Sequence, residues 1–365
     1  MRASPNMRCS NLRGVRMMEI CENVPLAPLT TLQVGGPARY FAAAENEDEL
    51  RDALRFSDAR KLPLFILGGG SNLLVADRGW AGLVLKVAIT GLATEVDGSI
   101  AMITAGSGVN WDSLVAEAVA RNVAGVECLS GIPGAVGGTP VQNVGAYGQE
   151  VSETIESVRA FDRKRGDTVE LTNQQCGFRY RTSIFNTSAR GRYIILSVRF
   201  RLHVDVAPSL KYADLRQHFA EFASPPSLAQ VRDAVWKIRE SKGMLIVPGD
   251  ENSRSAGSFF KNPVLSEKQF AELAHRAESR GLNIPSYPAL QAQHKVSAAW
   301  LVEHSGFCKG FRMGEAGISS KHALALINAG HATAADVLQL KEHIQQRVDR
   351  MWGILLEPEP VFVGF

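Results

Sequence analysis

Residues 131–148 read GIPGAVGGTPVQNVGAYG, and a shorter glycine cluster, GGGSN, occupies residues 68–72 directly after the apolar residues 64–67. The longer stretch contains six glycines and no charged residue. Backbone without side chains can approach a diphosphate closely and donate N–H groups to its oxygens. A stretch so rich in glycine is entropically costly to fix unless something orders it. We therefore interpret both loops as candidate cofactor sites, although a five-residue glycine loop alone is about as often a simple tight turn.

Neither loop matches the common nucleotide-binding fingerprints. Gly68 and Gly70 have the Gly-x-Gly spacing, but the third glycine of the Rossmann motif is missing. No acidic residue follows at the distance expected for a ribose partner, and no G-x-x-x-x-G-K-[ST] P-loop is present. The cofactor fold is therefore expected to be something other than a dinucleotide-binding βαβ unit.

Hydrophobic periodicity gives the approximate element order. Apolar spacing predicts helices at residues 45–56, 111–121, 229–240, 267–280, 298–304 and 334–350, and strands at 62–67, 82–87, 158–161, 168–171, 193–202 and 355–365. Strands mixed with single helices indicate an α+β fold rather than a regular βαβ series. Polar, proline-bearing residues at 206–208 and 224–227 indicate a change of domain.

Composition excludes several classes of protein. A chain of 365 residues with 45% hydrophobic and 21% charged residues is globular and large enough for two or three domains. A net charge of +3 gives no reason to expect nucleic acid as a partner. Five scattered cysteines, none in a C-x-x-C, argue for a reducing compartment, and eight histidines without ligand spacing argue against a metal site.

The N-terminus and the absence of a long apolar run bear on localisation. No apolar run is long enough to span a bilayer, so we expect no membrane insertion and a cytoplasmic location. The basic start of the chain lacks the apolar stretch of a signal peptide. Residues 1–18 are expected to be a disordered tail, or the product of a start codon placed before Met17 or Met18.

Several motifs in order along the chain resemble the UDP-N-acetylenolpyruvoylglucosamine reductases. The resemblance covers nearly everything from about Pro28 to Phe365. Besides the two glycine loops, it rests on Thr31-x-x-x-Gly-Gly-Pro-Ala (31–38), FRYRTSIF (178–185), AGSFFKNP (256–263) and LEPE (356–359). Residues 211–215, KYADL, look like the inserted segment that distinguishes the longer form of this family.

The resemblance implies a fold and a domain plan. It implies an α+β protein with an FAD-binding domain of the p-cresol methylhydroxylase type at residues 24–205, in subdomains of about 24–88 and 89–205. A substrate-binding region would follow at 206–365. That region would include the inserted segment 206–228 and a last strand, 355–365, which returns to the FAD domain. Residues 1–23 would be the disordered tail.

The same resemblance implies the cofactors and the reaction. It implies non-covalent FAD, NADPH as hydride donor, a sugar-nucleotide substrate, and a monomer acting in cytoplasmic peptidoglycan precursor synthesis. The absence of histidine from both glycine loops agrees with non-covalent FAD. The implied FAD-binding residues are Gly68, Gly69, Gly70, Ser71, Asn72, Leu73, Ile132, Pro133, Gly134, Gly137, Gly138, Asn143, Gly145, Ala146 and Tyr147.

Three residues carry the implied chemistry. Arg181 would face the substrate carboxylate, Ser258 would protonate the substrate carbon, and Glu359 would act with Arg181 on the enolate. Spacing alone does not separate Glu359 from Glu357, and the family motif favours the former. The residues implied to hold the substrate are Tyr180, Tyr212, Arg239, Lys242, Asn262, Lys295 and Arg312. Some longer-form members carry glutamine at the position of Arg312.

Other interpretations remain open at this point. Without the resemblance, Arg181 would be a snorkelling surface residue, Ser258 a turn hydroxyl and Glu359 an edge residue. Arg239 and Lys242, three residues apart, would share one helical face, which could be a solvated basic face. The chain could also be another FAD-linked oxidase or dehydrogenase of the same flavin fold, or a non-catalytic sugar-nucleotide-binding module.

Overall fold

The computed structural model describes residues 18–288 and 293–365, and the chain divides into two compact units. Unit 1 contains residues up to 24, 38–70 and 81–241, and unit 2 contains residues 25–37, 71–80 and 242–365. The predicted boundary near residue 206 falls inside unit 1. Of the predicted tail at 1–23, residues 1–17 lie outside the described ranges, and strand β1 (Ile20–Pro25) begins within the remainder.

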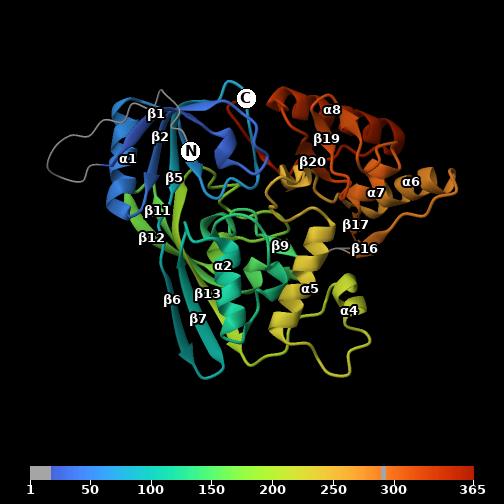
Figure 1. Ribbon diagram of the computed structural model, residues 1–365, viewed down its shortest axis with the longest axis horizontal. Helices are drawn as coiled ribbons and strands as arrows, with labels where there is room; N and C mark the ends of the chain where they lie inside the picture. The colour runs from blue at the N-terminus through green and yellow to red at the C-terminus, as the bar shows by residue number, and fades with distance from the viewer. Residues whose placement is uncertain (1–17, 289–292) are drawn as a thin grey trace. The chain divides into compact units, whose positions relative to one another are not determined.

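The first sheet of unit 1 has four strands in the order β1-β2-β5-β3 (Figure 1). Its other members are β2 (Pro37–Ala44), β5 (Trp80–Val87) and β3 (Leu64–Leu67), of which β3 and β5 run parallel. Helix α1 (Glu47–Ala59) starts after Asn46, whose side-chain oxygen accepts a hydrogen bond from the N–H of Glu49. Its buried Leu50 belongs to the same hydrophobic cluster as Leu83 of β5, so α1 covers this sheet.

The second sheet of unit 1 is antiparallel, in the order β12-β11-β13-β7-β6, with the short β8 beside β13. Its strands are β12 (Asp167–Thr172), β11 (Ile155–Asp162), β13 (Tyr193–Val204), β7 (Ile100–Gly106), β6 (Leu92–Asp97) and β8 (Val123–Ala124). Helix α2 (Trp111–Ala120) buries Trp111 and Leu114 in the same cluster as Ile103 of β7. The unit also contains helices α3 (Asn173–Cys176), α4 (Ala213–His218) and α5 (Leu228–Ser241) and the short strands β9 (Gly145–Ala146) and β10 (Gln149–Glu150).

Unit 2 is built on a four-stranded sheet in the order β14-β20-β19-β18. Its strands are β14 (Ser255–Ser258), β20 (Ala325–Asn328), β19 (Ala316–Ile318) and β18 (Arg312–Met313). A smaller sheet joins β15 (Val264–Leu265), β17 (His294–Val296) and β16 (Ser286–Pro288), and β21 (Val361–Val363) pairs in parallel with β4 (Leu73–Val75). The helices are α6 (Glu267–Glu278), α7 (Ala298–Glu303) and α8 (Ala334–Trp352).

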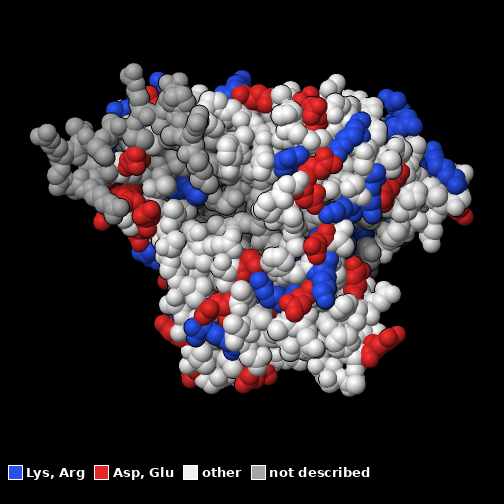
Figure 2. All heavy atoms as spheres, in the orientation of Figure 1, with Lys and Arg blue, Asp and Glu red and all other residues white. Residues whose placement is uncertain are grey.

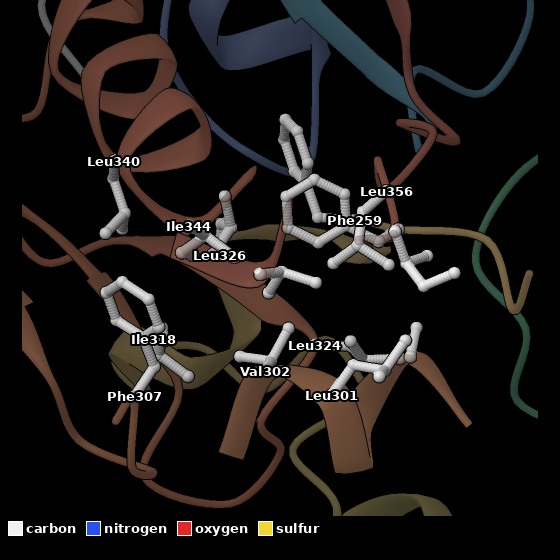
Figure 3. Packing of buried hydrophobic residues seen from close by; sticks show 14 of the residues in the cluster. Phe259, Leu301, Val302, Phe307, Ile318, Leu324, Leu326, Leu340, Ile344 and Leu356 are labelled. Atoms are coloured by element: carbon white, nitrogen blue, oxygen red, sulfur yellow. The ribbon is translucent and has the colours of Figure 1, made fainter. Parts of the chain in front are cut away.

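One hydrophobic cluster holds unit 2 together. Figure 3 shows Leu340 and Ile344 of α8 facing Leu326 of β20 and Val302 of α7. Phe259, directly after β14, is fully buried in the same cluster. Helix α8 ends at Gly353, whose φ of 72° is left-handed and closes the helix at low steric cost.

The sequence identified most helices but few of the short strands. Each predicted helix is present within a few residues of its expected ends. The predicted strand at 355–365 is a strand only over Val361–Val363, and β2 and β7 were not predicted. Across the described ranges, no helix is long and apolar enough to cross a bilayer. Figure 2 shows acidic and basic side chains interspersed on the face in view.

Candidate active site

The two glycine loops meet in unit 1. Strand β3 leads directly into Gly68-Gly69-Gly70. A Cβ atom on Gly69 would lie 2.5 Å from the Cα atom of Gly134 and 2.7 Å from the nitrogen of Ala135, closer than real Cβ atoms approach other atoms. Gly134 also has a φ of 133°, which residues with side chains rarely adopt. Glycine at 69 and 134 therefore permits a direct backbone contact between the loops.

The longer loop is fixed to the strand end and helix start beside it. The N–H of Gly137 donates to the carbonyl of Ser107 at 2.9 Å, and the N–H of Val136 donates to the carbonyl of Val109 at 2.9 Å. The N–H of Trp111, the first residue of α2, donates to the carbonyl of Gly134 at 3.1 Å. A Cβ on Gly137 would lie 2.5 Å from the Cβ of Ser107. Backbone hydrogen bonds therefore hold the loop at residues 134–137.

The loops retain room and hydrogen-bonding capacity for a polar cofactor. A Cβ built on Gly68 or Gly138 would meet nothing within 4 Å. Ser107 is buried, and its hydroxyl is without a hydrogen-bond partner among the described residues. Such a group is costly unless a ligand or water satisfies it. These features fit a cofactor diphosphate. The sequence analysis missed Ser107, although its position between Gly106 and Gly108 was an available signal.

Two of the predicted cofactor residues have other contacts. The Asn143 side chain donates to the Glu150 carboxylate at 2.8 Å and to the Arg179 carbonyl at 3.2 Å, and its oxygen accepts the N–H of Ser152 at 3.0 Å. Tyr147 packs edge to face against Tyr212, with ring centroids 5.3 Å apart. Asn143 therefore braces the loop itself, and Tyr147 joins a residue implied to hold the substrate.

Arg181 occupies the tip of a tight turn. Arg179 and Thr182 exchange two backbone hydrogen bonds of 3.0 and 3.1 Å, which places Tyr180 and Arg181 at the tip. Arg181 has a φ of 56°, and the side-chain amide of Asn186 donates to its carbonyl at 3.2 Å. A residue other than glycine in the left-handed region is uncommon, and such positions cluster at functional sites.

Arg239 is a buried cation beside the two tyrosines. Only 7% of its surface is exposed, and its side chain hydrogen-bonds to Tyr147. Burial lowers the pKa of Arg239, and the interaction with Tyr147 and, less strongly, the charge of Asp112 counteract this. Asp112 is itself held in a bidentate pair by Arg232, with both N–O distances at 2.7 Å, and accepts the Gly131 N–H at 2.6 Å. The Asp112 carboxylate near Arg239 is therefore already bound by Arg232. This arrangement would allow Arg239 to interact with a further anion.

The predicted common helical face of Arg239 and Lys242 is wrong. Helix α5 ends at Ser241, so Lys242 lies beyond it. Gly243, with a φ of 63°, adopts the left-handed conformation that terminates helices. The alternative of a solvated basic face also fails for Arg239, because that side chain is buried.

Ser258 lies at the end of a bulged strand in unit 2. Ser255 is opposite Ile327 and Ser258 is opposite Ala325, so β14 has one residue more than β20 in this interval. Gly257 within the bulge has a φ of 74°. Bulges redirect side chains and occur often beside active sites. Phe259, fully buried, anchors the strand immediately after Ser258.

The structure separates the two glutamates of the LEPE motif. Glu357 is exposed, and its carboxylate pairs with the Lys261 ammonium at 2.6 Å. Glu359 is half-buried, and its N–H donates to the carbonyl of Phe259 at 2.9 Å. The Asn72 side-chain amide donates to the Glu359 carbonyl at 3.3 Å. Glu359 is therefore held next to the Ser258 strand, whereas Glu357 is engaged at the surface.

The remaining implied substrate residues of unit 2 are partly engaged. The Asn262 side-chain oxygen accepts the Ala298 N–H at 2.9 Å, at the start of α7. Lys295 lies in β17 opposite Val264. Arg312 is exposed and forms an ion pair with Glu251.

His322 is a further residue that the sequence analysis missed. Burial, assisted by the charges of Lys242 and Lys309, lowers its pKa to about 4, so this imidazole is neutral at pH 7. No sequence spacing signalled it.

Comparison with known proteins identifies the cofactor domain. Residues 38–172 match the FAD binding domain family. This range includes both glycine loops and Ser107. The chain is therefore an FAD-dependent oxidoreductase, and the predicted α+β flavoprotein fold and FAD cofactor are confirmed.

The rest of the chain specifies the family. Residues 249–363 match the C-terminal domain of UDP-N-acetylenolpyruvoylglucosamine reductase. Reductases of that name from Thermobifida fusca and Streptomyces coelicolor are 47% and 42% identical, over 94% and 96% of this chain and 97% and 92% of theirs. The crystal structure of the UDP-N-acetylenolpyruvylglucosamine reductase from Thermus caldophilus matches with a TM-score of 0.65 at 28% identity, covering 95% of this chain and all of that one. The chain belongs to the UDP-N-acetylenolpyruvoylglucosamine reductase family, which confirms the predicted resemblance.

Proposed function

We propose that this chain reduces UDP-N-acetylglucosamine enolpyruvate to UDP-N-acetylmuramate with NADPH as hydride donor, as a cytoplasmic monomer in peptidoglycan precursor synthesis. The identity to named reductases over nearly the whole chain supports the reaction. The observation that carries the proposal is the backbone bond between Glu359 and Phe259. It holds a carboxyl group beside the strand that carries a serine hydroxyl, and the proposed reduction uses both groups.

FAD, when bound, supplies the hydride chemistry, and the chain supplies binding, orientation and charge stabilisation. Residues 68–72 and 131–138 would hold the diphosphate through backbone N–H groups other than those of Gly131 and residues 136–138, which already donate within the protein. The Ser107 hydroxyl would add one side-chain donor. None of these backbone and hydroxyl groups is charged, so the two glycine loops and Ser107 would bind a non-covalent, buried diphosphate by hydrogen bonds alone.

The sugar nucleotide requires cations. Arg239 is buried and already poised for an anion, so it would bind the substrate diphosphate, with Tyr212 beside it through Tyr147. Lys242, Asn262, Lys295 and Arg312 would contact the UDP moiety. Arg312 and Glu251 form an ion pair. Arg312 would therefore have to bind Glu251 and the substrate at the same time, or release Glu251.

The reacting carboxylate requires a different set of groups. Arg181 would bind the substrate carboxylate through its guanidinium fork, and charge builds on this group as hydride adds to the alkene. Glu359 would act together with Arg181 on the developing enolate. Ser258 would give its hydroxyl proton to the neighbouring carbon.

The test uses purified chain loaded with FAD. We expect NADPH oxidation that depends on UDP-N-acetylglucosamine enolpyruvate, and a protein that lacks this activity would refute the proposal. Ser258→Ala should still be reduced by NADPH at near the wild-type rate. Its reoxidation by the enolpyruvyl substrate should slow by at least ~10²–10⁴, the usual loss for a general acid.

Ser279→Ala is the control, because this exposed hydroxyl of the same unit donates to the Arg276 carbonyl at 2.9 Å, away from the β14 bulge. If Ser258→Ala reoxidises as fast as Ser279→Ala, Ser258 is not the proton donor. Light scattering tests the monomer, for which the mass is 39.6 kDa.

A further inference from the structure

Thr31 makes a long-range hydrogen bond to the strand of Ser258. Its hydroxyl donates to the carbonyl of Ser255 at 2.6 Å, across 224 positions in the sequence. The carbonyl of Ser71 lies 3.3 Å from the same oxygen, so it shares this single proton more weakly. Both contacts lie within unit 2. The neighbours Leu32 and Val34 are buried in the unit 2 cluster, which fixes the backbone that presents the hydroxyl.

The bonded carbonyl belongs to the residue at the start of the bulge. One backbone hydrogen bond flanks the bulge on each side. The N–H of Asn328 donates to the Arg254 carbonyl at 2.9 Å, and the N–H of Phe259 donates to the Leu324 carbonyl at 2.8 Å. The extra residue of β14 lies between these bonds. Thr31 therefore fixes the backbone where the strand is least constrained by its neighbour, and the bulge sets the direction of the Ser258 side chain.

The second contact of Thr31 leads to the other reactive group. Ser71 precedes Asn72, whose side-chain amide donates to the Glu359 carbonyl at 3.3 Å. The carbonyl of Asn72 also accepts the N–H of Val361 at 2.9 Å. The Thr31 hydroxyl thus contacts both the strand that carries Ser258 and the Ser71–Asn72 segment, which binds the backbone of Glu359.

We propose that Thr31 is a positioning residue for the protonation step, because it fixes the β14 bulge and thereby aims the Ser258 hydroxyl. The inference rests on the role of Ser258 in the proposed function. Thr31 does not touch the substrate in this scheme. A displacement of about 1 Å in a reacting group can cost ~10²-fold in rate, so the loss of one fixing bond is expected to be visible.

The experiment compares Thr31→Val with Thr31→Ser. Valine keeps the shape and removes the donor, and serine restores the donor. With FAD-loaded enzyme, Thr31→Val should be reduced by NADPH at the wild-type rate but reoxidised by UDP-N-acetylglucosamine enolpyruvate ~10- to ~100-fold more slowly. Thr31→Ser should recover most of the lost rate. The solvent deuterium isotope effect on reoxidation should rise in Thr31→Val, because proton transfer becomes more limiting.

Thr30→Val is the matched control. Its hydroxyl is buried but bonds only locally, donating to the Ala27 carbonyl and accepting the Gln33 N–H. It should reoxidise like wild type. FAD content, melting temperature and the substrate Kd from flavin fluorescence should be similar in Thr31→Val and Thr30→Val. If Thr31→Val does not fold, Thr31→Ala provides the same comparison.

Three results would overturn the inference. They are wild-type reoxidation by Thr31→Val, a Thr31→Ser enzyme as slow as Thr31→Val, and an equal loss in Thr30→Val. If Ser258→Ala is slow while Thr31→Val is fast, this inference alone fails. If Ser258→Ala reoxidises at the wild-type rate, the assigned proton donor and this inference fail together.

Discussion

Adding one methyl group to the short glycine loop should have different consequences at two adjacent positions. At Gly69 the new Cβ would lie 2.5 Å from the Cα of Gly134 and 2.7 Å from the Ala135 nitrogen. Carbon atoms prefer separations of about 3.5–4.0 Å, so Gly69→Ala would force the two loops apart by about 1 Å. At Gly68 the same Cβ would meet no protein atom within 4 Å.

The two variants should therefore differ in the protein without FAD. Overpacking of this size costs about 1–3 kcal/mol, which lowers the melting temperature of a domain this large by roughly 2–10 °C. Apo Gly69→Ala should show that loss, and apo Gly68→Ala should melt close to wild type. Gly330→Ala is the control, because its Cβ would meet only the flexible Glu315 carboxylate, at 3.3 Å.

FAD titration tests whether each variant affects cofactor binding directly or through a displaced loop. If the diphosphate lies against Gly68, a methyl group there occupies its space, so Gly68→Ala should weaken FAD binding although the apo protein is intact. Gly69→Ala should weaken it too, through the displaced loop. Fluorescence titration of apo protein with FAD measures both values. If Gly68→Ala binds FAD as tightly as wild type, the open space at Gly68 is not part of the cofactor site. An unchanged melting temperature in Gly69→Ala would refute the direct contact between the two glycine loops.

Two further predictions concern charged residues. Arg239→Gln and Lys242→Ala should each raise the KM for the UDP substrate by ~10- to ~100-fold, the equivalent of a lost charge-assisted hydrogen bond, with flavin reduction by NADPH nearly unchanged. Lys237→Ala is the control, because Lys237 is exposed on the helix that carries Arg239. Equal KM values in all three variants would refute the role of Arg239 and Lys242 in substrate binding. Hydrogen bonding to Arg192 lowers the pKa of Asp162 to about 2, so the stability that this pair adds is present above about pH 4 and disappears as pH falls to about 2. The difference in free energy of unfolding between wild type and Arg192→Gln should therefore shrink over that interval in denaturant titrations, and a difference independent of pH would contradict the pairing.

The sequence was informative where structure depends on local patterns. Helical periodicity located α5 and α8, and the glycine content of residues 131–148 indicated a loop that approaches another group closely. Helix α5 ends at Ser241, within one residue of the predicted end, and the error lay in placing Lys242 on its face although Gly243 follows directly. That glycine was readable in the sequence, so this error was avoidable.

Other features depend on contacts that no local pattern records. Residues 25–37 and 71–80 belong to the same compact unit as residues 242–365, far along the chain, and the bond from Thr31 to Ser255 has no signature near either residue. The burial of Arg239 likewise follows from tertiary packing, because an arginine near the end of an amphipathic helix is usually exposed. Spacing alone did not separate Glu357 from Glu359, and the family motif favoured Glu359; the structure adds that Lys261 engages Glu357.

In the proposed function a weak acid is the proton donor, and the anchoring of Ser258 and Glu359 would explain how it could serve. A serine hydroxyl offers little acidity, so its rate depends on where it is held. Ser258 precedes Phe259, and Glu359 follows Leu356 by three positions; Figure 3 shows Phe259 and Leu356 in one hydrophobic cluster, where both are fully buried. The N–H of Glu359 donates to the Phe259 carbonyl, so the two segments are also joined by their backbones. A small movement of this core would therefore carry both residues together and preserve their relative position.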